Sequence, residues 1–275
     1  MSNLYIHYPY CKQACHYCNF HFSTMKKGRD QIMGLIEKEL EIRVNEVKSP
    51  LDSIYFGGGS PSLISIKSLA CFIQKIKEDF EISNEVEITM EVNPDDVSKD
   101  YLLGLKESGI NRLSLGIQSF FEKDLQLMNR AHSADQARKS LGLVGKYFDN
   151  FSLDLIYGMP NSNLLDWKKN ISLALEHNPL HISAYVLTVE KKTALYHQIK
   201  QKKVKPISDE AVKDQYDFLI DKLDSEGYIN YEFSSFGKPG YFSVNNQNYW
   251  NGKAYLGLGP SAYSYYGIGQ RSWNV

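Results

Sequence analysis

Cysteine is scarce in this sequence, with four among 275 residues. The chain also has no excess of positive or negative charge, because its net charge is −1. A near-neutral chain lacks the broad positive field that nucleic acids and anionic membranes attract. No apolar run approaches the roughly 18 residues of a membrane span. The opening residues lack the basic and apolar segments of a secretory signal, which predicts a cytoplasmic protein. The lysines between 200 and 205 are interpreted as a solvated helix end and loop.

Three of the four cysteines lie within eight residues, as Cys11, Cys15 and Cys18. This C-x3-C-x2-C spacing suits one iron–sulfur cluster, and since a cubane cluster usually takes four thiolates, one iron would stay open to another ligand. Two alternatives remain open. A zinc site would need His16 or His21 as further ligands, and a disulfide would need an oxidising compartment.

The fourth cysteine, Cys71, lies in an apolar stretch and is predicted to be a small core residue rather than a fourth ligand.

Short apolar runs alternate with longer amphipathic stretches along most of the chain. The runs predict strands at residues 4–8, 53–56, 86–92, 112–117, 152–157 and 181–187. The amphipathic stretches predict helices at about residues 30–47, 66–79, 99–108, 134–147, 164–177 and 209–226. Six such units predict a parallel sheet.

Unusual residues follow the predicted strands. The cysteines come after the first strand and a Gly-Gly-Gly-Ser-Pro loop, residues 57–61, comes after the second. Asn93-Pro94 follows the third strand and Gln118 the fourth. Because ligands bind at the carboxyl ends of parallel strands, these segments are expected to form one site.

The composition changes near residue 227. Residues 228–233 alternate like an antiparallel strand, residues 245–250 are polar and aromatic, and residues 256–260 predict a tight loop. We therefore expect a core over residues 1–226 and the start of a second, incomplete region over residues 227–275.

Seven motifs in order along the chain resemble the radical S-adenosylmethionine (SAM) superfamily, and within it the HemN/HemW group. That group contains oxygen-independent coproporphyrinogen III oxidases and heme chaperones. The motifs are Tyr5-Ile-His-Tyr-Pro9, the cysteine motif, Gly57–Pro61, Glu91–Pro94, Gly116–Phe120, Asn129–His132 and Asp154–Pro160. The resemblance implies an α/β fold, a partial (β/α)6 TIM-like barrel, followed by a short α+β region that is truncated.

The resemblance also implies a 4Fe–4S cluster on the three clustered cysteines, with SAM chelating the fourth iron. Gly58 and Gly59 would let the backbone approach SAM, and Ser60 would add a hydroxyl. Arg130 would pair with the SAM carboxylate. The remaining implied SAM contacts are the acceptors Glu91, Gln118 and Asp154 and the aromatic residues Tyr17, on the adenine, and Tyr5, at the mouth of the site. Each role has an alternative interpretation. The glycine loop could be a plain turn, Arg130 could form a structural ion pair with Glu91 or Asp154, and Asp154 could accept hydrogen bonds from backbone amides.

Within the group, the oxidases carry another cysteine two positions after the third ligand, where this chain has Phe20. This favours the heme-chaperone branch, which implies heme or another tetrapyrrole as ligand, an acceptor protein for heme, and a reductant protein such as flavodoxin or ferredoxin. Two departures weaken the heme expectation, because Asn245 and Tyr263 stand where relatives have histidine. The alternatives are a coproporphyrinogen III oxidase-like enzyme of porphyrin biosynthesis and a plain electron-transfer protein.

Overall fold

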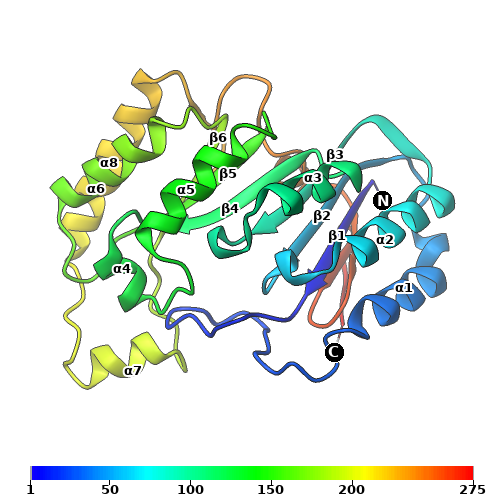
Figure 1. Ribbon diagram of the computed structural model, residues 1–275, viewed down its shortest axis with the longest axis horizontal. Helices are drawn as coiled ribbons and strands as arrows, with labels where there is room; N and C mark the ends of the chain where they lie inside the picture. Colours follow the sequence, from blue (N-terminus) through cyan, green and yellow to red (C-terminus); the bar gives the residue numbers. More distant parts are fainter. Residues whose placement is uncertain (1, 275) are drawn as a thin grey trace.

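The computed structural model describes residues 2–274, which form one curved sheet flanked by helices (Figure 1). Its centre consists of parallel strands in chain order. They are β1 Asn3–Tyr8, β2 Leu51–Gly58, β3 Ile82–Val92, β4 Arg112–Gln118, β5 Phe151–Tyr157 and β6 His181–Val186. The fold is the predicted α/β fold, a partial (β/α)6 TIM-like barrel, and each predicted strand is present with bounds that differ by a few residues.

The two faces of the sheet differ in chemistry, because side chains alternate along a strand. Outward positions such as Leu4, Ile54 and Leu113 are fully buried beneath helices. Inward positions such as Glu91 and Asp154 carry polar groups and face a cavity. The concave side of the sheet is therefore kept open for a ligand instead of being filled with branched side chains.

The helices follow one another along the outer side of the sheet (Figure 1). The long ones are α1 Ile32–Arg43, α2 Ile66–Asp79, α3 Lys99–Glu107, α5 Ala134–Val144, α6 Leu164–Leu175 and α8 Asp209–Ser225. Three short helices, α4 Glu122–Leu127, α7 Ala194–Lys200 and α9 Val244–Trp250, were not predicted, because each covers only about two turns. No helix within residues 2–274 is both long and apolar enough to cross a membrane.

Cys71 is exposed, so the prediction that it is a core residue is wrong. Helix α2 buries Leu69, Phe72, Ile73 and Ile76, which share one face at helical spacing. Position 71 falls outside that face. An apolar stretch in sequence is therefore not a buried stretch in an amphipathic helix.

The chain beyond residue 226 adds strands to both edges of the sheet. Strands β7 Ile229–Asn230 and β8 Ser235–Gly237 continue antiparallel from β6. Strand β9 Tyr255–Leu258 lies parallel to β1, and β10 Tyr263–Gly267 and β11 Gln270–Trp273 follow it. The expected strand at 228–233 thus exists only in part, and the division of the chain at residue 226 stays a prediction.

The tight loop expected at residues 256–260 is largely a strand. Leu256 and Leu258 are fully buried, and they lie beside Leu4 and Ile6 of β1. Gly257 permits close packing, since a Cβ there would lie 2.0 Å from the carbonyl oxygen of Tyr263. Gly257 therefore serves strand packing, whereas Gly259, with φ +91°, lies in the turn that follows β9.

Candidate functional site: a cysteine-lined cavity

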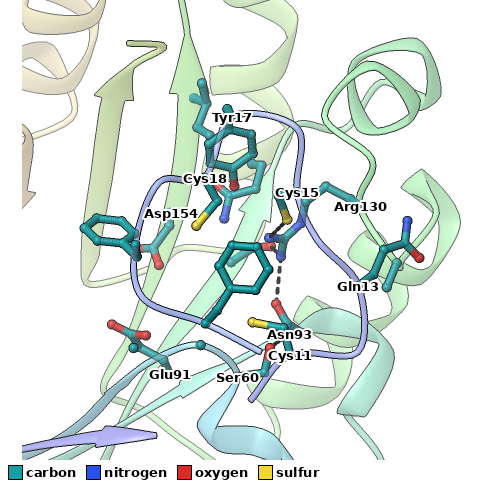
Figure 2. Close-up of a pocket in the computed structure, with 18 of the residues that line it drawn as sticks. Cys11, Gln13, Cys15, Tyr17, Cys18, Ser60, Glu91, Asn93, Arg130 and Asp154 are labelled. Atoms are coloured by element: carbon teal, nitrogen blue, oxygen red, sulfur yellow. Dashed lines mark hydrogen bonds between the residues drawn. The ribbon is translucent and has the colours of Figure 1, made fainter. Parts of the chain in front are cut away.

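The carboxyl ends of β1 to β6 surround a cavity of about 680 Å³. This lies within the usual range of ligand sites, roughly 300–1,000 Å³. Figure 2 shows the labelled cysteines, Arg130 and two carboxylates around one hollow. Of the residues predicted for the site, those that line the cavity are Cys11, Cys15, Tyr17, Cys18, Gly58, Gly59, Ser60, Glu91, Gln118, Arg130 and Asp154. Segments far apart in sequence thus meet where the strand-end argument expects them.

Tyr5 is the predicted site residue that does not line this cavity. It lies on β1, where its hydroxyl and Nδ1 of His7 are 3.2 Å apart and its ring stacks on Tyr55 at 6.1 Å. Tyr5 therefore packs among inward-facing side chains of β1 and β2 and does not line the cavity.

The cysteine loop is fastened to its neighbours by backbone hydrogen bonds. Cys11 N–H donates to the carbonyl of Ser23 at 2.9 Å, and His16 N–H donates to that of Met128 at 2.9 Å. Burial raises the pKa of Cys11 to about 11 and also raises that of Cys18. These two thiols are therefore protonated at neutral pH, and binding iron there would release protons.

The donor set fits a cluster better than a single ion. All four cysteines are free, and no group of three His, Cys, Asp or Glu side chains within residues 2–274 is placed to hold one metal ion. A zinc ion would need its ligands to converge on one point. In a cubane each thiolate binds a different iron, so three thiols spread around a cavity are compatible with it.

Arg130 links the cysteines to the loops after β2 and β3. Its Nη1 donates to Cys15 Sγ at 3.4 Å, and its Nη2 donates to Asn93 Oδ1 at 2.7 Å and to the Gly116 carbonyl at 3.0 Å. Asn93 Nδ2 in turn donates to Ser60 Oγ at 2.9 Å. Within residues 2–274, Arg130 forms no ion pair with a carboxylate and its buried Nε has no partner, which fits an incoming acceptor such as a carboxylate.

Asn93 lies at the site, as the strand-end argument expects, but sequence reasoning gave its side chain no role. It was noticed as part of Glu91-Val-Asn-Pro94, and nothing in that motif says which side chain reaches Arg130. Its position two residues after Glu91 was the available signal, because residues i and i+2 of a strand share a face.

Two half-buried carboxylates face the cavity from β3 and β5. Burial raises the pKa of Glu91 to about 7, although its Oε1 accepts a hydrogen bond from Tyr55 at 2.9 Å. Burial also raises the pKa of Asp154 to about 6, although both its oxygens lie within 3.2 Å of the Ser114 hydroxyl. Ionising these carboxyls inside the protein costs free energy, so they suit a ligand that brings positive charge or several hydrogen-bond donors.

The glycines of the loop after β2 have reasons within the chain as well. A Cβ on Gly59 would lie 2.8 Å from the Tyr10 carbonyl oxygen and 3.0 Å from Cys11 Sγ. Gly58 has φ +109°, and a Cβ there would lie 2.8 Å from the His7 ring. Both glycines therefore let the loop pack against the cysteine loop, whatever ligand also approaches them.

Comparison with known proteins agrees with this geometry. The Radical SAM superfamily profile matches residues 5–174. The chain is 33% identical over 279 residues to "Heme chaperone HemW" of Bacillus subtilis, covering all of this chain and 73% of that protein. It is 35% identical over 271 residues to the protein of the same name in Buchnera aphidicola, covering 95% of this chain and 69% of that one.

The structure superposes on coproporphyrinogen III oxidase (HemN) of Escherichia coli with a TM-score of 0.80. The identity is 24%, so this likeness concerns the fold. The match covers 95% of this chain but 64% of the oxidase, so the chain spans less than two thirds of that protein's length.

Proposed function

Because the chain belongs to the radical SAM superfamily and, within it, to the family of the HemW proteins, we propose that it binds a 4Fe–4S cluster, SAM and heme, and passes heme to an acceptor protein. Cys11, Cys15 and Cys18 would hold the cluster. When bound, cluster and SAM would supply one-electron chemistry at this cavity. We expect this activity in a reducing compartment such as the cytoplasm, because the clustered cysteines have to stay reduced to bind iron.

The charge of the cavity is the observation that carries the proposal. Its wall contains the carboxylates of Glu91, Asp95, Asp154 and Glu190, against two cations. Of these cations, Lys12 is already paired with Asp95 at 2.7 Å, and Arg130 is held by the contacts described above. An acidic cavity suits SAM, which carries a sulfonium and an ammonium group.

The residue at position 20 argues against the oxidase. Phe20 stands where the oxidases carry a further cysteine, and its side chain is 72% exposed at the cavity wall. We therefore rank the oxidase reaction second, and the plain electron-transfer protein third, because the polar wall exceeds what a cluster alone needs.

Heme would need an axial ligand, and the histidines differ in availability. His7 and His132 are committed to hydrogen bonds with backbone carbonyls, and burial lowers the pKa of His132 to about 4. Asn245 is buried, so it does not replace the missing histidine at an accessible position. His16, which uses only Nδ1, and the exposed His21 keep an imidazole nitrogen available within the described chain.

The first test is anaerobic reconstitution with iron and sulfide, followed by EPR of the reduced protein with and without SAM. We expect a 4Fe–4S signal that SAM changes and that Cys18→Ser abolishes, while Cys71→Ser leaves it intact. A cluster indifferent to SAM would contradict the open-iron site.

The second test is a hemin titration of the same protein. We expect a Soret shift that saturates near one equivalent and weakens in His16→Ala or His21→Ala. No shift at stoichiometric protein would exclude heme binding, and SAM-dependent formation of 5′-deoxyadenosine with a vinyl-bearing product would place the oxidase first.

A further inference from the structure

A group of exposed lysines surrounds α7 and is called the basic patch here. Its members are Lys191, Lys192, Lys200, Lys202, Lys203 and Lys205. None of the ion pairs within residues 2–274 includes one of them. Six like charges without partners repel one another and do not stabilise the fold. A partner outside the chain would explain why they gather.

The basic patch is attached to the cysteine loop. Leu195 of α7 donates its N–H to the carbonyl of His16 at 2.8 Å, and His16 follows Cys15 in the chain. Tyr17 and Leu187 pack on the same small apolar cluster, and Glu190, just before the patch, lines the cavity. Figure 1 shows α7 near the cysteine loop, away from the long outer helices.

The charge distribution indicates what kind of partner fits. The whole chain has a net charge of −1, so the rest of the chain is net negative once these six lysines are set apart. A long polyanion or a membrane surface would meet that repulsion beyond the patch, whereas a compact acidic protein would meet only the patch. A protein docked there would lie beside the cysteine loop.

We propose that the basic patch is the docking surface for an acidic one-electron carrier protein of the flavodoxin kind. The carrier's cofactor is oxidised by one electron and the cluster is reduced by one electron, and no bond forms or breaks. This inference rests on the proposed cluster. The lysines from 200 to 205 lie at the solvated end of α7 and in the loop after it, as expected, and the proposal adds a partner for them.

The test compares two charge-reversal variants. The patch variant is Lys200→Glu/Lys202→Glu/Lys203→Glu. The control is Lys67→Glu/Lys146→Glu/Lys169→Glu, which changes the net charge equally at exposed lysines on the outer helical side. Calorimetry would measure binding of a purified acidic flavodoxin to the chain without its cluster. We expect binding that weakens with added salt, about tenfold or more loss in the patch variant and little change in the control.

Anaerobic reduction of the reconstituted cluster by the reduced flavodoxin would give a second readout. We expect it to slow in the patch variant while cluster content and the SAM-dependent EPR change stay as in the wild type. Equal flavodoxin binding in the two variants, or loss only of binding to phosphatidylserine vesicles, would overturn the docking proposal. Failure of the wild-type chain to hold a cluster would instead overturn the proposed function, because binding is measured without the cluster.

Discussion

At the scale of single residues, Asn93 has the most specific role of the residues outside the predicted set. Its side chain accepts a hydrogen bond from Arg130 and donates one to Ser60. The side-chain hydrogen bonds of Asn93 go to Ser60 and Arg130 and to none of the cysteines. We therefore regard Asn93 as a positioning residue for Arg130.

We predict that Asn93→Ala weakens SAM binding about tenfold, since loss of a hydrogen bond to a charged group costs about 1.5 kcal/mol. Iron and sulfide content should stay normal, and calorimetry with SAM on the reconstituted protein measures the change. Asn84→Ala, an exposed position on the same strand, is the matched control. Equal loss of cluster and of SAM binding would mean that Asn93 acts only on folding.

Glu91 gives a second prediction at this scale, on stability against pH. In the unfolded chain this carboxyl has a pKa near 4.5, and in the fold burial raises that pKa to about 7. Between these values the folded chain binds more protons, so the free energy of unfolding falls as pH rises through this window and levels off above it.

We expect Glu91→Gln to remove about 1–3 kcal/mol of that decline. Urea unfolding of the cluster-free chain at pH 5 and pH 8 checks it, with Glu85→Gln, exposed on the same strand, as control. A decline of the same size in the wild type and in Glu91→Gln would contradict the assignment.

At the scale of elements, the contact between the loop after β2 and the cysteine loop decides where the thiols lie. Gly59 N–H donates to the Tyr8 carbonyl at 2.7 Å, and Ser60 N–H donates to the Tyr10 carbonyl at 2.8 Å. Two neighbouring backbone bonds thus hold the loops together at the position where a side chain on Gly59 has no room.

We predict that Gly59→Ala displaces the cysteine loop and lowers cluster occupancy by half or more, at a cost of about 1–3 kcal/mol from overpacking. Iron and acid-labile sulfide per chain, together with a thermal melt, report it. Gly142→Ala in α5, where a Cβ meets nothing within 4 Å, should leave both unchanged or stabilise the helix slightly. Full occupancy in Gly59→Ala would mean that the loop adapts.

The elements that sequence predicted well carry a strong local signal. Ser98 and Ser133 cap α3 and α5, the second with a full capping box to Gln136, and α2 has the predicted bounds. The missed elements depend on distant partners. Strand β9 exists because β1 offers it an edge, and α9 follows a cap by Ser243, whose environment includes Glu87 of β3.

At the scale of the whole molecule, the position of the site could be predicted from the sequence, whereas the hydrogen bonds within the site could not. Parallel strands bring their carboxyl ends together, which predicted one site from the cysteines, the loop with Ser60, Asn93 and Gln118, and all of these line the same cavity. Which donor meets which acceptor depends on side-chain directions set by the twist of the sheet. That is why the hydrogen bonds of Asn93 and the packing of Tyr5 became visible only in the structure.

The place of β1 has a consequence for biosynthesis. This strand is synthesised well before β9, yet it lies between β2 and β9, and its Leu4 is neighboured by both Ile54 and Leu256. One of its two edges therefore waits until about 250 further residues have been translated. Since the cysteine loop continues directly from β1, we expect stable metal loading to follow the synthesis of β9 and not to precede it.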